Sequence, residues 1–166
     1  MRERSHKKGE TYQRAVKHWL AETTFLGFDV ELFGDAYDVT KKACTIGGVA
    51  FDFSLTLRRG AVARHILYAE CKYRNEQRGN VDAEFEAFLH HVHDALAAAE
   101  KDDAEGAVFV FVSNVPPQDW RRFLRDRRGH CRKLTWGPNQ PDVQVLDRIL
   151  TCVHVLVLSD RIIERG

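Results

Sequence analysis

The order of hydrophobic patterns along this sequence predicts an α/β domain with a central mixed β-sheet flanked by helices. Three observations carry this prediction. An amphipathic helical pattern opens the chain, residues 49–57 alternate between apolar and polar side chains, and residues 107–112 are continuously apolar. Strict alternation is typical of a strand with one buried face, whereas a short apolar run is typical of a strand that is buried on both faces.

The first helix is expected over residues 9–26, where apolar side chains recur at helical spacing and Gly27 then ends the segment. Residues 28–33 are expected to form a short strand after it. The stretch over residues 35–48 is ambiguous, and a further strand around residues 37–40 is left open there.

A β-hairpin is expected next. Its first strand spans residues 49–57 and directs Asp52 away from the buried face, because successive side chains of a strand point to opposite sides. A turn over residues 58–61 leads to the second strand, over residues 65–73. One face of that second strand is expected to carry Ile66, Tyr68, Glu70 and Lys72.

The second half of the chain continues with further helices and strands. Another amphipathic helix is expected over residues 81–99, entered through a polar loop at residues 75–80. The later patterns predict a buried strand, a third helix, a further helix and a final strand, at residues 107–112, 120–124, 143–150 and 153–158. No Gly/Ser-rich linker separates these segments, so we expect a single domain.

Composition favours a soluble protein of the cytoplasm. The 166 residues are 44% hydrophobic, which suffices for a core that buries about two-thirds of the surface of the unfolded chain. The four cysteines are scattered without a Cys-x-x-Cys pair, a pattern that favours reduced thiols. The charged start of the chain lacks the apolar stretch of a signal peptide, and no run approaches the roughly 20 apolar residues of a membrane span. We therefore expect no membrane partner.

The formal net charge is only +1, so a nucleic-acid partner would have to be recognised by local basic groups. Basic residues concentrate at the start of the chain and again after residue 120. The side chains considered for phosphate contact are Arg14, Lys17, Arg121, Arg122 and Arg125. Solvated helix faces explain the same pattern, and both interpretations stay open.

The predicted hairpin places two carboxylates opposite each other, because Asp52 and Glu70 lie equally far in sequence from a turn centred on Ala61. Like charges across a ladder are destabilising, whereas an opposite-charge or aromatic pair would contribute about 0.2–1 kcal/mol. A bound cation explains the pair, since Mg²⁺ prefers oxygen ligands and takes one or two protein carboxylates beside water and phosphate oxygens. Lys72 emerges on the same face as Glu70, within reach of a water or phosphate beside such an ion.

The helix, the strand that bears Asp52, the Glu-x-Lys strand and the following helix together resemble the PD-(D/E)xK nuclease superfamily. Residues 9–14, Gly-Glu-Thr-Tyr-Gln-Arg, are similar to the first helix of archaeal Holliday-junction resolvases and of Mrr-type restriction endonucleases. Those families usually carry Glu where Gln13 stands and proline where Phe51 stands. The resemblance covers about residues 8–113.

This resemblance implies a restriction-endonuclease-like αβββαβ core over about residues 8–113, with a helix and a strand added over residues 114–166 of the same domain. It implies a deoxyribonuclease that depends on Mg²⁺ or Mn²⁺ and acts in restriction, anti-phage defence or DNA repair. Asp52 and Glu70 would hold the metal, with the backbone carbonyl of Cys71 as a further ligand and its side chain in the core. Lys72 would orient or help deprotonate the attacking water.

Helical angle favours Gln13 over Glu10 as the catalytic contribution of the first helix, because Gln13 lies at the border of the buried face and Glu10 lies further toward solvent. An ordinary boundary residue is the alternative interpretation of Gln13. A second possible metal site is disfavoured, because its three histidines spread too widely around one helix to converge on an ion. These expected surface residues are His90, His91 and His93.

Interpretations from other classes stay open beside the nuclease. The chain is alternatively a nucleic-acid-binding module that keeps the fold without cutting, or an effector subunit whose target is chosen by a partner. RNA is kept as an alternative to DNA, and a homodimer or a larger defence or repair complex as alternative assemblies. Enzymes with a glycine-rich phosphate loop or a covalent Ser/His/Asp or Cys/His mechanism are disfavoured, because the sequence lacks the context of those motifs.

Overall fold

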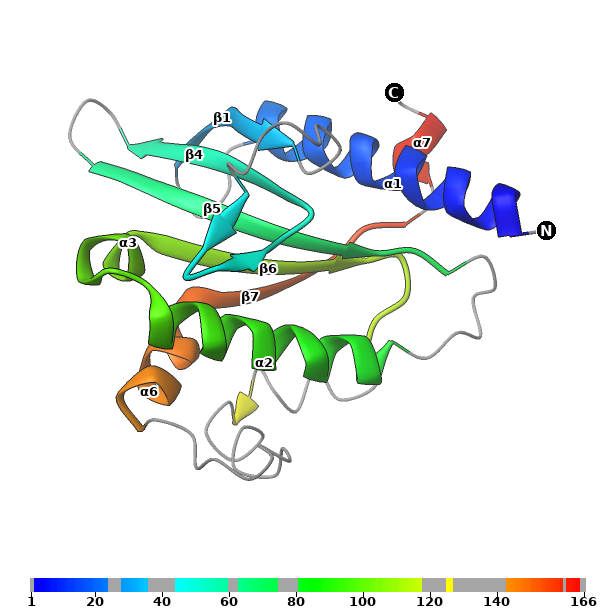
Figure 1. The fold of residues 1–166 in the computed structure, drawn as a ribbon. Coiled ribbons are helices and arrows are strands. Elements are labelled where there is room, and N and C mark those ends of the chain that lie inside the picture. The colour runs from blue at the N-terminus through cyan, green and yellow to red at the C-terminus, as the bar shows by residue number, and fades with distance from the viewer. Residues whose placement is uncertain are drawn as a thin grey trace.

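A five-stranded mixed sheet forms the centre of the part of the chain that the structure describes (Figure 1). The computed structural model describes residues 2–23, 28–35, 44–59, 63–74, 81–117, 125–126, 143–159 and 161–164. The strand order is β1 (Asp29–Asp35), β4 (Phe53–Arg59), β5 (Ala63–Lys72), β6 (Ala107–Ser113) and β7 (Val153–Val157). The first three strands are antiparallel neighbours, whereas β5, β6 and β7 run parallel. The predicted α/β class with a mixed sheet is confirmed.

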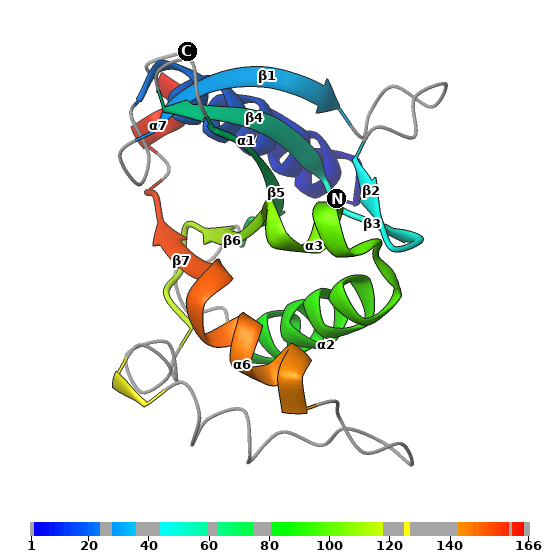
Figure 2. The same ribbon diagram turned by 90° about the vertical axis from the view of Figure 1, so that its left-hand side faces the viewer.

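Helices cover both faces of this sheet (Figure 2). On one face lie α1 (Arg2–Glu22) and the short α7 (Arg161–Glu164), which packs against α1. On the other face lie α2 (Asp82–Ala98) and α6 (Val143–Cys152), which contact each other and β6. A short helix, α3 (Lys101–Glu105), follows α2. Among the described residues, no helix is both long and apolar enough to cross a membrane.

The sheet separates two apolar cores. Alternate side chains of β6 enter different cores, since Phe109 and Phe111 pack with α2 whereas Val110 and Val112 pack with α1. All four are fully buried. The continuous apolar run at residues 107–112 is therefore a strand that is covered on both faces, as predicted.

The hairpin of β4 and β5 has the predicted register. Phe53 pairs with Ala69 at one end, and Arg59 pairs with Ala63 at the other. This register is centred on residue 61, although residues 60–62 themselves lie outside the described part of the chain. Because register in a hairpin follows from the position of the turn, the pattern of apolar residues sufficed to predict it.

The prediction of one continuous strand over residues 49–57 is wrong, because the strand breaks at Phe51 and Asp52. Before the break, β2 (Thr45–Ile46) and β3 (Val49–Ala50) form a separate antiparallel ribbon. After it, the alternation has shifted, since Phe51 packs in the α2 core and Phe53 in the α1 core.

The β2–β3 ribbon packs against α2 and does not extend β4. Its turn consists of Gly47 and Gly48, with φ of 58° and 78°, which a tight two-residue hairpin turn requires. A Cβ atom at Gly47 would lie 2.2 Å from the carbonyl oxygen of Ala95 in α2. Ser54, expected on a polar face, is fully buried, and its Oγ lies 3.9 Å from the Sγ atom of Cys44.

The other predicted elements are confirmed in kind where the structure describes them, with shifted ends. The first helix runs over residues 2–22 instead of 9–26, and α2, α6 and β7 correspond to the predictions at residues 81–99, 143–150 and 153–158. Three predicted segments lie outside the described residues, namely the strand at 37–40, the loop at 75–80 and the helix at 120–124. The sequence patterns did not predict α3, α7 or the β2–β3 ribbon.

Candidate active site

The candidate site lies where β4 begins and β5 ends. Asp52 immediately precedes β4, and its N–H donates a hydrogen bond to the carbonyl oxygen of Ala69, at 3.0 Å. Its side chain turns toward β5, where the N–H of Cys71 donates to Oδ2 of Asp52 at 2.8 Å. These two hydrogen bonds hold the carboxylate of Asp52 beside Glu70, although Asp52 stands at a bend and outside the regular ladder.

The carboxylate of Asp52 lies in a partly desolvated position. Burial raises its pKa above the usual range, while the hydrogen bond from Cys71 and the positive charge of Lys72 lower it. Burial is the largest of these effects, so the pKa stays raised. The hydrogen bond and the lysine therefore offset only part of the cost of burying the ionised carboxylate of Asp52. A further positive charge nearby would lower its pKa and favour the ionised form.

Glu70 is more strongly perturbed. Burial, which is the largest cause, and the negative charge of Asp52 together raise its pKa to about 7, although the positive charge of Lys72 opposes both. Its side chain is 13% exposed, so solvent screens these charges only in part. Near neutral pH the carboxyl group of Glu70 is thus poised between its protonated and ionised forms.

Lys72 is the charge that both carboxylates share. It lies two residues beyond Glu70 on the same face of β5, is half-buried, and pairs with Ser113 in the neighbouring strand β6. Its positive charge lowers the pKa of Asp52 and of Glu70. The structure thus brings together the two acids and the lysine that the sequence pattern singled out.

Cys71 points to the opposite face, as expected from strand alternation. Its side chain packs against the α1 core, and burial raises the pKa of its thiol well above the usual value. The thiol is therefore neutral and inert, and Cys71 serves the site through its backbone N–H.

Gln13 reaches the site from α1. Its side chain is buried, and Nε2 donates a hydrogen bond to the backbone carbonyl oxygen of Asp52 at 3.2 Å. Glu10, the alternative from the same helix, is half-exposed. Gln13 therefore contacts the backbone that carries Asp52.

His91 is the neighbour of the site that sequence reasoning missed. Its Nδ1 atom lies 3.8 Å from Oε1 of Glu70, although its side chain is 49% exposed. The other two histidines of α2 have different partners, since His90 lies near Glu86 and His93 near Asp94. The three histidines therefore lie near different acidic side chains, and helical spacing alone could not indicate that His91 lies near Glu70 at the end of β5.

The predicted basic contacts are dispersed. Arg14 is exposed on the flank of α1 away from Gln13, where it lines a groove of about 690 Å³ together with Trp19 and Ile162. Lys17 is half-buried on the same helix, and Arg125 is exposed. Arg121 and Arg122 lie outside the described residues.

The side chains of this site that could hold a metal ion are the two carboxylates of Asp52 and Glu70. Among the described residues, no group of three or more His, Cys, Asp or Glu side chains is placed to hold a metal ion. Mg²⁺ takes only one or two protein carboxylates and completes its shell with water and phosphate oxygens, so Asp52 and Glu70 suit it in number and in kind.

Comparison of the chain with protein-family models, with curated proteins and with solved structures returned no match. The functional interpretation of the site therefore depends on its geometry and its chemistry.

Proposed function

We propose that this protein is a divalent-metal-dependent nuclease whose site is formed by Asp52, Glu70 and Lys72. One observation carries the proposal. Two carboxylates share a partly desolvated position at the ends of adjacent strands, where burial raises the pKa of both. Stability does not favour such a pair, because each negative charge disfavours the other and neither is fully solvated. Strongly perturbed acids beside a lysine are typical of functional sites.

Mg²⁺ or Mn²⁺ is the cofactor that fits this donor set. Asp52 and Glu70 would hold the ion, and the backbone carbonyl of Cys71 is a further candidate ligand. When bound, the ion polarises a phosphate oxygen and supplies a water molecule of lowered pKa.

The residues of the chain contribute orientation and charge. The Cys71 N–H fixes one carboxylate oxygen of Asp52, so the carboxylate keeps a single orientation. Lys72 donates hydrogen bonds to the attacking water or to a phosphate oxygen and stabilises the negative charge that develops there. Gln13 keeps the Asp52 backbone in place through its carbonyl oxygen.

The order of the elements supports a nuclease of the PD-(D/E)xK type. The αβββαβ core that the sequence resemblance implies agrees with the chain order of α1, β1, β4, β5, α2 and β6. The implied C-terminal additions agree with α6 and β7. On this proposal the β2–β3 ribbon is an insertion. DNA is the proposed substrate, and restriction, anti-phage defence or repair the proposed setting.

A cleavage assay tests this proposal. The purified protein is incubated with Mg²⁺ or Mn²⁺ and with plasmid, linear duplex, single-stranded, four-way-junction and RNA substrates, beside Asp52→Asn and Lys72→Ala. We expect cleavage that requires the metal and falls by about 10²-fold or more in both variants. Lys101→Ala, at an exposed site on α3, serves as the control and should cleave normally.

Two results would contradict the nuclease. One is cleavage that persists in both variants or in the presence of EDTA, because a contaminating enzyme would then be responsible. The other is nucleic-acid binding without cleavage, together with calorimetry that detects no Mn²⁺ binding dependent on Glu70. That second result would instead support a non-cleaving binding module.

A further inference from the structure

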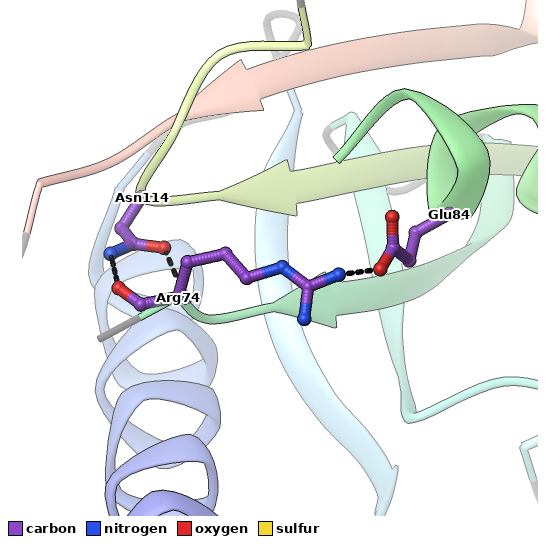
Figure 3. Close-up of polar contacts among 3 residues, drawn as sticks. All are labelled: Arg74, Glu84 and Asn114. Carbon is purple, nitrogen blue, oxygen red and sulfur yellow. Dashed lines mark hydrogen bonds and ion pairs between the residues drawn. The ribbon is translucent and has the colours of Figure 1, made fainter. Parts of the chain in front are cut away.

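Arg74 continues the face of β5 that carries the candidate site. Asn114, which follows β6, brackets its backbone: the N–H of Arg74 donates to Oδ1 of Asn114 at 2.9 Å, and Nδ2 of Asn114 donates to the carbonyl oxygen of Arg74 at 2.8 Å (Figure 3). One side chain thus extends the hydrogen bonding of the sheet beyond its last ladder pair, Lys72 and Ser113. The bracket fixes the direction in which Arg74 leaves the backbone.

That direction is toward α2, on the side of Glu70 and Lys72. Successive side chains of an extended chain alternate, so residues 70, 72 and 74 share one face. Two residues at about 3.3 Å each place Arg74 roughly 7 Å beyond Lys72 along the strand. Its guanidinium forms an ion pair with Glu84 in the first turn of α2 (Figure 3).

The ion pair leaves one carboxylate oxygen of Glu84 without a hydrogen bond among the described residues. It joins Nη2 of Arg74 to Oε1 of Glu84, whereas Oε2 of Glu84 is buried without a hydrogen-bond partner among the described residues. Arginine and carboxylate often pair through two parallel hydrogen bonds, and arginine has five N–H donors in a planar fork. The side chain of Arg74 is 39% exposed, so part of this fork is accessible to solvent.

We propose that Arg74 binds a backbone phosphate of the nucleic-acid substrate, next to the phosphate at Asp52 and Glu70. This inference rests on the proposed function, because it assumes that the substrate strand crosses the end of β5. A guanidinium matches phosphate oxygens in shape and charge better than an ammonium does. Glu84 is a positioning residue that holds the guanidinium at one nitrogen and leaves the other donors for the phosphate.

The simpler alternative is that the ion pair only ties α2 to the sheet. Partly exposed ion pairs contribute little to stability. An ion pair with only this structural role is not expected to affect the binding of nucleic acid. The two explanations therefore differ in a quantity that can be measured, the dependence of nucleic-acid affinity on salt. Each lost phosphate contact lowers that dependence, because fewer counterions are released on binding.

The test is fluorescence anisotropy with labelled single-stranded DNA, duplex DNA and RNA, in EDTA so that the probes stay intact. Wild type, Arg74→Gln, Arg74→Lys and Glu84→Gln are titrated over a range of NaCl concentrations. Arg59→Gln is the matched control, since Arg59 is exposed at the opposite end of β4. Melting temperatures establish that each variant is folded.

We expect Arg74→Gln to raise the Kd by about three- to tenfold and to lower the slope of log Kd against log salt by about 1. Arg74→Lys should keep most of the slope, because the charge remains, and lose part of the affinity. Glu84→Gln should keep the slope and raise the Kd, since the guanidinium is charged but no longer held. Arg59→Gln should change neither quantity.

The contrary outcomes separate this inference from the nuclease itself. If wild type binds and cleaves while Arg74→Gln keeps both its Kd and its salt slope, the phosphate contact is wrong and the nuclease stands. If wild type binds without cleavage and Arg74→Gln still loses slope, the contact is supported and the nuclease is wrong. If wild type binds none of the three probes and also cleaves no substrate in the presence of metal, both are overturned. An unchanged Kd in Glu84→Gln removes the positioning role of Glu84.

Discussion

The two faces of β5 belong to one backbone and differ in the side chains that they carry. Toward α1, Leu67 and Ala69 are fully buried and Cys71 continues the apolar surface. Toward α2, the apolar surface ends at Tyr68 and is followed by Glu70 and Lys72.

Burial acts on both faces but with different consequences. It raises the pKa of the Cys71 thiol, which leaves a neutral and inert group, and it raises the pKa of Glu70 to about 7, which leaves a group that changes charge near neutrality. On the proposed function, desolvation matters on the α2 face because the buried group there is an acid with a partner for its charge. The α1 face is thus expected to determine stability, and the α2 face activity.

The largest expected effect on stability comes from the α1 face. Leu67→Ala should lower the free energy of unfolding by about 2–5 kcal/mol, because it leaves a cavity at a fully buried position. Lys72→Ala, on the other face, should change it by less than about 1 kcal/mol while abolishing cleavage. Urea denaturation of both variants measures the difference, and a Lys72→Ala protein as unstable as Leu67→Ala would contradict the division of roles.

A smaller effect, opposite in sign, is expected at Glu70. Because the folded protein holds the pKa of Glu70 at about 7, above the usual 4.5, the folded state binds a proton that the unfolded state releases between these values. The contribution of Glu70 to the stability of the metal-free protein should therefore be fully present below about pH 4.5 and be lost as pH rises through 7. Glu70→Gln removes this loss and should be more stable than wild type by about 1–3 kcal/mol at pH 8 and nearly equal to it at pH 4.5.

Thermal or urea unfolding at both pH values, without metal, measures this difference. Glu86→Gln, whose side chain on α2 is 44% exposed, is the matched control and should differ from wild type by less than Glu70→Gln does at pH 8. Saturating Mg²⁺ should stabilise wild type and not Glu70→Gln. A Glu70→Gln protein that is less stable than wild type at pH 8 would show that the carboxylate has a stabilising partner instead of a repulsive one.

The smallest effect is expected where α1 meets the site. Gln13→Ala removes the hydrogen bond to the Asp52 carbonyl and should lower the free energy of unfolding by about 1 kcal/mol. Cleavage should fall more in kcat than in KM, because the residue positions Asp52 and does not touch substrate. A variant with unchanged kcat would leave Gln13 as an ordinary residue at the border of the core.

Much of the site followed from local patterns. The parity of residues on β4 and β5 and a turn centred on residue 61 sufficed to place Asp52 beside Glu70 and to put Lys72 on the same face. These are local properties, because alternation along a strand and the register of a hairpin depend on neighbouring residues alone. The amphipathic periods of α1 and α2 similarly indicated which of their residues are buried.

Only the tertiary structure decided which distant elements meet at that hairpin. The β2–β3 ribbon stands where the sequence pattern predicted an extension of β4, and Gly47 in its turn packs closely against Ala95 of α2. Three further contacts depend on how the helices pack on the sheet. They are the hydrogen bond from Gln13 to the Asp52 backbone, the approach of His91 to Glu70 and the ion pair of Arg74 with Glu84. Helical periodicity identifies a buried face but not the rotation and position in which that face packs, because these follow from the fit of side chains across the whole interface. The sequence by itself therefore determined the acids and the lysine, and the packing of α1 and α2 determined their surroundings.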